Sequence, residues 1–126
     1  MNLLLDTHAL VWFLFGSRRL SHAARCAIED TKNRALVSSV SGYEIAIKCM
    51  QGKIDFTVLN TLSTALRSAR FGELPVSMAH AIAAGQLAGP HRDPRDRLLM
   101  AQSRAEDLTL VTGDSTIASC GVKTLW

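Results

Sequence analysis

Two short apolar runs in this sequence each end in an aspartate. Residues 3–5 are three leucines that lead into Asp6, and residues 108–113 (Leu-Thr-Leu-Val-Thr-Gly) lead into Asp114. Continuous apolar runs of this length are typical of strands buried on both faces of a parallel sheet. Ligand sites in open α/β sheets lie beyond the carboxyl ends of such strands. A carboxylate at that edge is unfavourable unless a cation shares the site, which points to a metal.

The rest of the sequence alternates short strand patterns with helical patterns. The expected strands are 3–5, 35–39, 74–76, 109–112 and 122–125. The expected helices are 9–15, 21–30, 41–51, 58–71, 78–87, 94–107 and 115–119. Ser21 and Asp93 are expected to cap the helices that begin beside them, with Pro94 in the first helical position. Strands alternating with helices imply a mostly parallel sheet covered on both faces, an α/β fold.

The length and composition are those of one globular domain spanning residues 1–126. The chain is 48% hydrophobic and 20% charged, which excludes a disordered chain. No linker, repeat or low-complexity segment divides it. The apolar stretch 3–15 does not match a signal peptide, because no basic residue precedes it and Asp6 and His8 interrupt it.

The cysteines and the hydropathy both favour a cytoplasmic protein without a membrane partner. The three cysteines are Cys26, Cys49 and Cys120. They are widely separated and form no CxxC or zinc spacing, so we expect reduced thiols. Nothing in the sequence approaches the ~20 consecutive apolar residues that a membrane span needs.

Two further acids, Glu44 and Asp96, lie in expected helices. Asp96 is in a first helical turn, where the helix dipole favours a carboxylate, and it shares a face with Leu99 and Met100. Glu44 is explained equally well by an i,i+4 ion pair with Lys48. The opposite side of that helix is expected to carry an apolar stripe of Tyr43, Ile47 and Met50.

Local structure also offers an explanation for each aspartate. Asp6 and Asp114 could serve as helix caps or turn residues. Asp93 is explained best as a helix N-cap, although a catalytic or metal role for it stays open. As a set the four acids are harder to explain locally, because all could converge on one crevice. They are Asp6, Glu44, Asp96 and Asp114.

The charge distribution suits a polyanionic partner. The formal net charge is only +3. When these four of the 11 acids are set aside, the 14 basic residues outnumber the remaining acids by seven. A basic surface around an acidic pit would hold a polyanion over a metal centre. The same scattered basic residues would equally serve solubility alone.

At five places in order, the sequence resembles the PIN-domain ribonucleases, in particular the VapC toxins of bacterial type II toxin–antitoxin pairs. The matching segments are 3–10 (LLLDTHAL), 41–48 (SGYEIAIK), 91–99 (HRDPRDRLL), 110–114 (LVTGD) and 121–126 (GVKTLW). The resemblance implies a PIN-like three-layer α/β/α sandwich. It assigns Mg²⁺ or Mn²⁺ binding to Asp6, Glu44, Asp96 and Asp114. The sequence departs from the subfamily at Gly42, Tyr43 and Arg95, where larger apolar or aromatic residues are common.

The chemistry of the acids agrees with this resemblance. Two carboxylates ~4 Å apart repel by about 4 kcal/mol at an effective dielectric near 20, and a divalent cation relieves that repulsion. Oxygen ligands select Mg²⁺ or Mn²⁺ over zinc, and the bound ion activates water for in-line attack on a phosphate. Asp6 and Asp96 are the first choices as direct ligands. Asp114 and Glu44 are expected to complete the shell or orient water.

Other residues near the acids have expected supporting roles. The hydroxyl of Thr112 could orient water. Three arginines flank Asp96 and could hold backbone phosphates, although a solvated loop explains them equally well. They are Arg92, Arg95 and Arg97. The mechanism requires no histidine as a base.

The resemblance implies an RNA substrate, single-stranded or looped, that is cut endonucleolytically. It implies a VapB-type antitoxin whose C-terminal segment covers the acidic crevice, and it favours a homodimer. A structure-specific DNA nuclease with the same acidic site is an alternative, as is a catalytically silent module that binds nucleic acid or protein. A nucleotide-binding role is disfavoured, because neither GxGxxG nor GxxxxGK[ST] is present.

Overall fold

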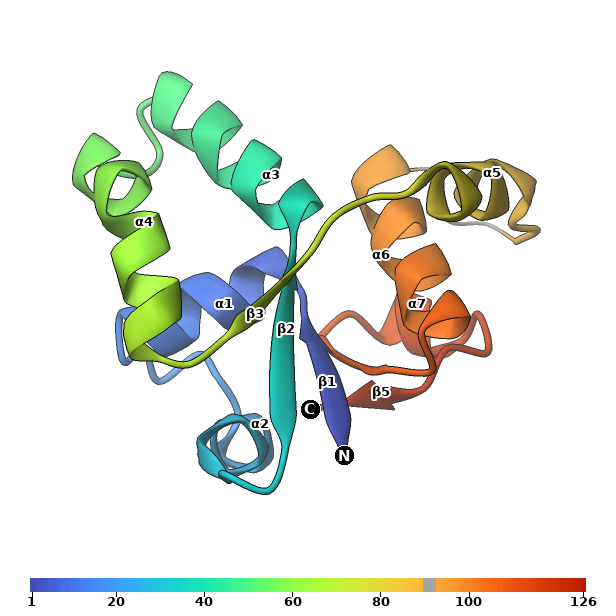
Figure 1. The fold of residues 1–126 in the computed structure, drawn as a ribbon, viewed down its shortest axis with the longest axis horizontal. Coiled ribbons are helices and arrows are strands. Elements are labelled where there is room, and N and C mark those ends of the chain that lie inside the picture. The colour runs from blue at the N-terminus through green and yellow to red at the C-terminus, as the bar shows by residue number, and fades with distance from the viewer. Residues whose placement is uncertain (90–92) are drawn as a thin grey trace.

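The computed structural model describes residues 1–89 and 93–126, and within them a five-stranded parallel sheet forms the centre (Figure 1). The strand order is β3-β2-β1-β4-β5. The strands are β1 (Asn2–Leu5), β2 (Arg34–Ser38), β3 (Gly72–Leu74), β4 (Thr109–Val111) and β5 (Thr124–Leu125). β1 lies in the middle, with Leu4 opposite Leu36 on one side and Leu110 on the other. The predicted parallel sheet is therefore confirmed.

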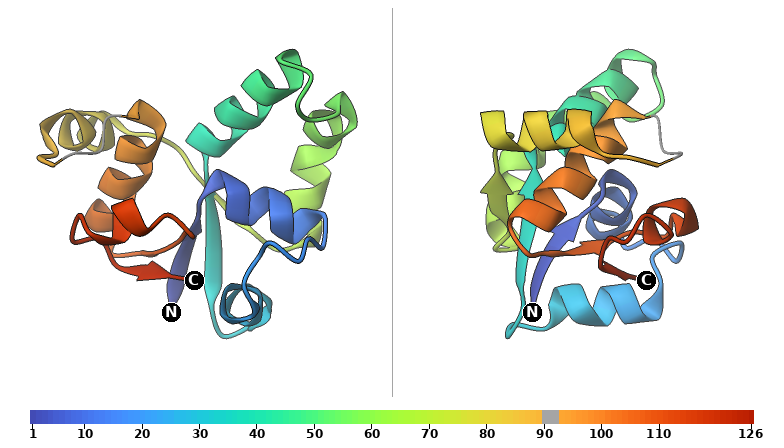
Figure 2. Two further views of the ribbon diagram at one scale, coloured as in Figure 1. Left: turned by 180° about the vertical axis from the view of Figure 1, so that it is seen from behind. Right: turned by 90° about the vertical axis from the view of Figure 1, so that its right-hand side faces the viewer.

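Helices cover both faces of the sheet. They are α1 (Thr7–Leu14), α2 (His22–Glu29), α3 (Ser39–Met50), α4 (Phe56–Ser68), α5 (Met78–Gln86), α6 (Pro94–Ala105) and α7 (Ser115–Ala118). Helices α1, α2 and α4 lie on one side of the strands, and α5, α6 and α7 lie on the other (Figures 1 and 2). The predicted three-layer α/β/α architecture is confirmed.

Alternation along β1 divides the core into two clusters. Leu3 and Leu5 pack with residues of α1, α2, α3 and α4, whereas Leu4 packs with residues of α6 and α7. All three leucines have 0% exposure. Successive strand side chains point to opposite faces, so a strand covered on both sides must be apolar at every position. The burial of Leu3–Leu5 therefore fixes the position of the residue that follows, Asp6.

Several element boundaries differ from the sequence prediction, and two of these differences have a clear local cause. Helix α3 begins at Ser39 rather than at residue 41, because the Ser38 side chain accepts a hydrogen bond from the Val40 amide and caps it. Strand β3 is Gly72–Leu74 rather than 74–76, with Gly72 opposite Leu36. A Cβ at Gly72 would lie 2.7 Å from the Leu36 side chain, so glycine permits this close pairing.

The predicted apolar stripe on α3 was wrong. Tyr43 and Met50 are 64% and 79% exposed. The buried face of α3 carries Val40, Ile45 and Cys49 instead. The helix begins two residues earlier than predicted and contacts elements of both layers, and these tertiary contacts select the buried face. In the described part of the chain, no helix has both the length and the apolar character that crossing a membrane requires.

Replacing Leu110 by alanine tests the importance of the central strands. Leu110 lies on β4 with 0% exposure, so the change removes buried methyl groups and leaves a cavity between the layers. We expect the free energy of unfolding in urea to fall by about 2–5 kcal/mol. Ile82→Ala is the control, since Ile82 is 54% exposed on α5. Equal losses in the two variants would contradict this account of the core.

Candidate active site

A cavity of about 220 Å³ lies at the carboxyl ends of the central strands and is lined by carboxylates. The acids in its wall are Asp6, Glu44, Asp93, Asp96 and Asp114. They come from the end of β1, from α3, from the start of α6 and from the turn after β4. The structure therefore brings together the four acids selected from the sequence, and Asp93 with them. The apolar side of the cavity is formed by Leu99 and Ile117.

Three of these acids cap helices that begin at the cavity. Asp6 accepts a hydrogen bond from the Ala9 amide at 2.7 Å, Asp93 from the Arg95 amide at 2.9 Å, and Asp114 from the Thr116 amide at 2.9 Å. The capping predicted for Asp93 before Pro94 is confirmed. A capping carboxylate is stabilised by free backbone N–H groups and by the positive end of the helix dipole. Capping and lining the cavity are thus compatible roles for one side chain.

Burial in the cavity wall shifts the pKa of Asp6. Removal from water raises the pKa of Asp6 above its ordinary value of 3.8. Hydrogen bonds from the Thr112 hydroxyl and the Ala9 amide lower the pKa and partly offset this rise. The Thr112 oxygen also accepts a hydrogen bond from the Asp114 amide at 3.1 Å. Thr112 therefore links Asp6 to the turn that holds Asp114.

Glu44 pairs with Arg95, not with Lys48 as the local alternative suggested. The Arg95 Nε lies 3.4 Å from a Glu44 oxygen and 3.4 Å from an Asp93 oxygen. Hydrogen bonding to Asp93, with the nearby charges of Glu44 and Asp96, raises the pKa of the guanidinium further. The Glu44 side chain is only 14% exposed. A permanent cation therefore sits between two acids of the cavity.

Two polar contacts near the cavity were not predicted from the sequence. Thr7 donates a buried hydrogen bond to the Ser41 hydroxyl at 3.0 Å, which ties the start of α1 to α3. Lys48 lines the cavity, with its Nζ 3.4 Å from the His8 Nε2. Lys48 follows Glu44 by four residues, so both lie on one face of the helix. This spacing could have predicted that Lys48 lies near the cavity when Glu44 does.

The arginines predicted near Asp96 have different locations. Arg95 lines the cavity. Arg97 donates to the backbone carbonyls of Ala84 at 3.1 Å and Leu87 at 2.6 Å, so it holds the end of α5. Arg92 lies outside the described residues, as does His91.

The donor set of the cavity suits a hard divalent cation. Carboxylate oxygens are the ligands that Mg²⁺ and Mn²⁺ prefer, and several negative charges around one cavity favour a cation there. In residues 1–89 and 93–126, no group of three or more His, Cys, Asp or Glu side chains is arranged to hold a metal ion. A cation bound by Glu44 would compete with Arg95, whose Nε lies 3.4 Å from a Glu44 oxygen.

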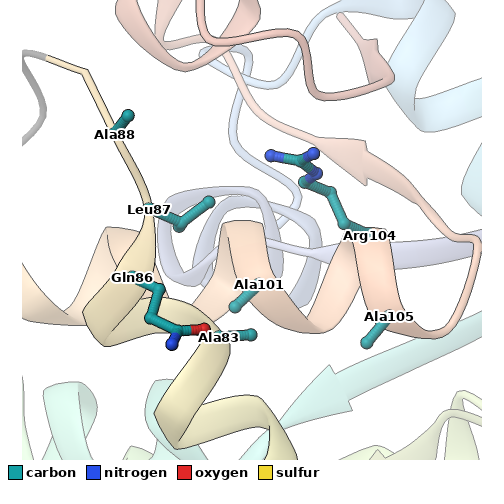
Figure 3. Close-up of a pocket in the computed structure, with 7 residues that line it drawn as sticks. All are labelled: Ala83, Gln86, Leu87, Ala88, Ala101, Arg104 and Ala105. Atoms are coloured by element: carbon teal, nitrogen blue, oxygen red, sulfur yellow. The ribbon is translucent and has the colours of Figure 1, made fainter.

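A larger hollow of about 460 Å³ lies between α5 and α6 (Figure 3). Its lining comprises Ala83, Gln86, Leu87, Ala88, Ala101, Arg104 and Ala105. None of the described residues in its wall has a carboxylate, an imidazole or a thiol. The hollow therefore lacks the groups that acid–base or metal chemistry needs, and the smaller acidic cavity is the candidate active site.

The PIN domain family model matches residues 3–122. The chain therefore belongs to the PIN domain family, and the resemblance seen in its sequence motifs is confirmed. A similar curated protein is Ribonuclease VapC22 of Mycobacterium tuberculosis (strain ATCC 25618 / H37Rv). It is 33% identical over 123 residues, which are 94% of this chain and 91% of that protein.

Solved structures share the fold over nearly the whole chain. VapBC2 from Rickettsia felis, bound to a DNA fragment from its promoter, matches with a TM-score of 0.74 and 18% identity. That match covers 99% of this chain and 98% of the other. A toxin–antitoxin complex from Klebsiella pneumoniae matches with a TM-score of 0.72 and 20% identity, over 98% and 95% of the two chains. At these identities the matches establish the fold.

The raised pKa of Asp6 predicts how Asp6→Asn changes stability with pH. A raised folded-state pKa means that ionising Asp6 destabilises the folded protein, so stability is lost as pH rises from 3.8 through the folded pKa. Asparagine stays neutral and still caps the helix. We expect the melting temperature of the variant, relative to the parent, to increase from pH 3 to pH 7.

Asp107→Asn is the control for this measurement. Asp107 is exposed, and a hydrogen bond from Lys123 lowers its pKa. Ionisation of Asp107 therefore favours the folded state, and its variant should lose stability relative to the parent as pH rises. If the melting temperatures of the two variants, relative to the parent, changed with pH in the same direction, burial would not be what sets the pKa of Asp6.

Proposed function

We propose that this chain is a metal-dependent endoribonuclease and the toxin of a VapBC-type toxin–antitoxin pair. The observation that carries the proposal is the set of carboxylates from separate elements in one cavity at the carboxyl edge of the sheet. Family membership supports nuclease chemistry at this edge. The similarity to Ribonuclease VapC22 supports RNA as the substrate.

The cofactor in this proposal is Mg²⁺ or Mn²⁺. Asp6 and Asp96 are the proposed direct ligands, and Glu44 and Asp114 complete the shell or hold the attacking water. When bound, the ion would lower the pKa of that water and stabilise negative charge on the scissile phosphate. The hydrogen bond from Thr112 keeps the Asp6 carboxylate oriented. Asp93 stays primarily a helix cap in this scheme.

Lys48 and Arg95 are the proposed phosphate contacts. Both line the cavity, and both are cations among acids. If a bound cation shared the charge of Glu44, the Arg95 guanidinium could turn from Glu44 to a phosphate and form two parallel hydrogen bonds to it. The excess of basic over acidic residues outside the cavity attracts the RNA backbone.

The proposed partner is a VapB-type antitoxin. The solved structures that share this fold include VapBC2 from Rickettsia felis and the toxin–antitoxin complex from Klebsiella pneumoniae. An antitoxin segment that covers the acidic cavity would exclude both RNA and solvent from it. A cationic side chain on that segment would complement the carboxylates of the cavity.

Asp96→Asn tests the proposed cleavage. The change removes one ionised ligand and keeps the size of the side chain, so we expect RNA cleavage in Mn²⁺ to fall at least about 100-fold. The measurement is cleavage of single-stranded RNA by the purified chain, with circular dichroism to show that the variant is folded.

Asp107→Asn is the matched control, since the same chemical change is made outside the cavity. Asp107 has a φ of 52°, a conformation that asparagine tolerates well. Full cleavage by folded Asp96→Asn would overturn the assignment of the site. A DNA strand of the same sequence is digested in parallel, and cleavage of DNA alone would replace RNA by DNA as the substrate.

Arg95→Gln tests the competition between Arg95 and the metal. A metal that binds only the folded state raises the melting temperature, and stabilises by about 2.7 kcal/mol at 100 times its Kd. Removing the guanidinium removes the cation that neutralises Glu44, so we expect Mn²⁺ to raise the melting temperature more in Arg95→Gln than in the parent. Calorimetric titration should show a several-fold lower Kd for Mn²⁺.

Arg104→Gln is the control for this experiment. Arg104 is exposed on the same helix, α6, and lines the other hollow. Its replacement should leave the Mn²⁺ response unchanged. Equal melting curves in EDTA and in excess Mn²⁺ for the parent would count against metal binding in the cavity.

A further inference from the structure

Three aromatic rings form a row that begins at the acidic cavity. His8 and Trp12 are one helical turn apart on α1, with ring centroids 5.2 Å apart and planes only 13° from parallel. The Trp126 ring lies 5.8 Å from Trp12 and is tilted by 58°. We refer to His8, Trp12 and Trp126 as the aromatic row. A stacked imidazole–indole pair at helical spacing presents flat apolar surfaces in a fixed orientation.

Both ends of the aromatic row lie next to residues of the proposed cleavage site. His8 is itself part of the cavity wall and lies two residues after Asp6. Trp126 packs against Gly113, the residue before Asp114. A Cβ added to Gly113 would lie 2.9 Å from the indole, so only glycine allows this contact. The row therefore extends from the cavity to the turn after β4.

Core packing explains only the middle of the aromatic row. Trp12 is partly buried and packs against the cluster that contains Leu3 and Leu5. His8 is exposed, and Trp126 is 39% exposed. A ring whose role was only to fill the core would be buried like Leu10, which has 0% exposure. The buried part of Trp12 anchors the row to the core, while His8 and Trp126 at its two ends remain accessible.

The charges around His8 complement a nucleotide. Lys48 Nζ lies 3.4 Å from the His8 Nε2, so a cation stands at the edge of the stacked ring. One nucleotide combines a flat base with an anionic phosphate. The aromatic ring would take the base, and the ammonium group of Lys48 would take the phosphate beside it.

We propose that the aromatic row is a stacking site for an unpaired base of the RNA, adjacent to the phosphate that is cut. This inference rests on the proposed function and adds to it a requirement on the substrate. The base must be unstacked from its neighbours to reach the ring, so the site selects single-stranded segments over duplex RNA. Stacking accepts every base, because each has a π-face, so the row contributes affinity rather than sequence selection.

The intrinsic fluorescence of the protein reports on this site directly. The chain has two tryptophans, and both belong to the aromatic row. The probe is a short single-stranded RNA of mixed sequence, titrated in Mg²⁺ into the Asp96→Asn protein, which is not expected to cut it. We expect saturable quenching. Additional His8→Ala should weaken binding about tenfold, and His8→Phe should restore it to within about twofold, since a phenylalanine ring can also stack on a base.

A series of oligonucleotides with one abasic position each locates the stacked base. Removing the base at one position should weaken binding to the Asp96→Asn protein about tenfold. The same oligonucleotide should bind the protein with the additional His8→Ala change no more weakly than the intact RNA does, because that variant already lacks the contact. Phe15→Ala is the matched control: Phe15 is 61% exposed at the other end of α1, outside the aromatic row. Its replacement should leave the affinity for RNA unchanged.

The possible failures of the two proposals are distinct. Equal affinity of His8→Ala and its parent, or equal binding of every abasic oligonucleotide, would overturn the stacking site. If the unmodified protein still cut RNA in Mn²⁺, the proposed function would stand. Failure of His8→Phe to restore binding would also reject stacking in favour of a polar role for the imidazole. Absence of RNA binding by every variant would overturn both proposals together.

Discussion

Mutual repulsion among carboxylates at one sheet edge is the constraint on which the site depends. Asp6, Asp93 and Asp114 each accept a hydrogen bond from a backbone amide at the start of a helix. Glu44 is held by the guanidinium of Arg95. The negative charges of these four acids are thus matched locally, which lets them share one cavity in a folded protein. In the proposed metal-bound state, the ion would replace some of these local partners.

Much of the fold and of the site followed from short apolar runs. A run such as Leu3–Leu5 must be covered on both faces, which requires a parallel sheet between two helical layers. The acid after such a strand falls at the carboxyl edge by geometry alone. The positions of Asp6 and Asp114 were therefore predictable from the sequence, as were the helix caps at Ser21 and Asp93, which are local signals.

The features that the sequence did not reveal depend on distant contacts. Glu44 has a plausible partner four residues away in Lys48, yet it pairs with Arg95 from another helix. The exposed face of α3 carries Tyr43, which a periodicity argument places in the core. Local spacing describes one helix in isolation, whereas the packing of α3 against both layers decides which side is covered. The aromatic row likewise joins residues from opposite ends of the chain.

The central position of β1 has a consequence for synthesis on the ribosome. β1 pairs with β4, with Leu3 opposite Thr109, so β1 is made long before one of its two neighbouring strands. Until β4 has left the ribosomal exit tunnel, one edge of β1 has no strand to pair with, and Asp6 and Asp114 cannot lie in one cavity. A nascent chain with this topology therefore cannot assemble the acidic cavity before β4 has been synthesised and has left the tunnel.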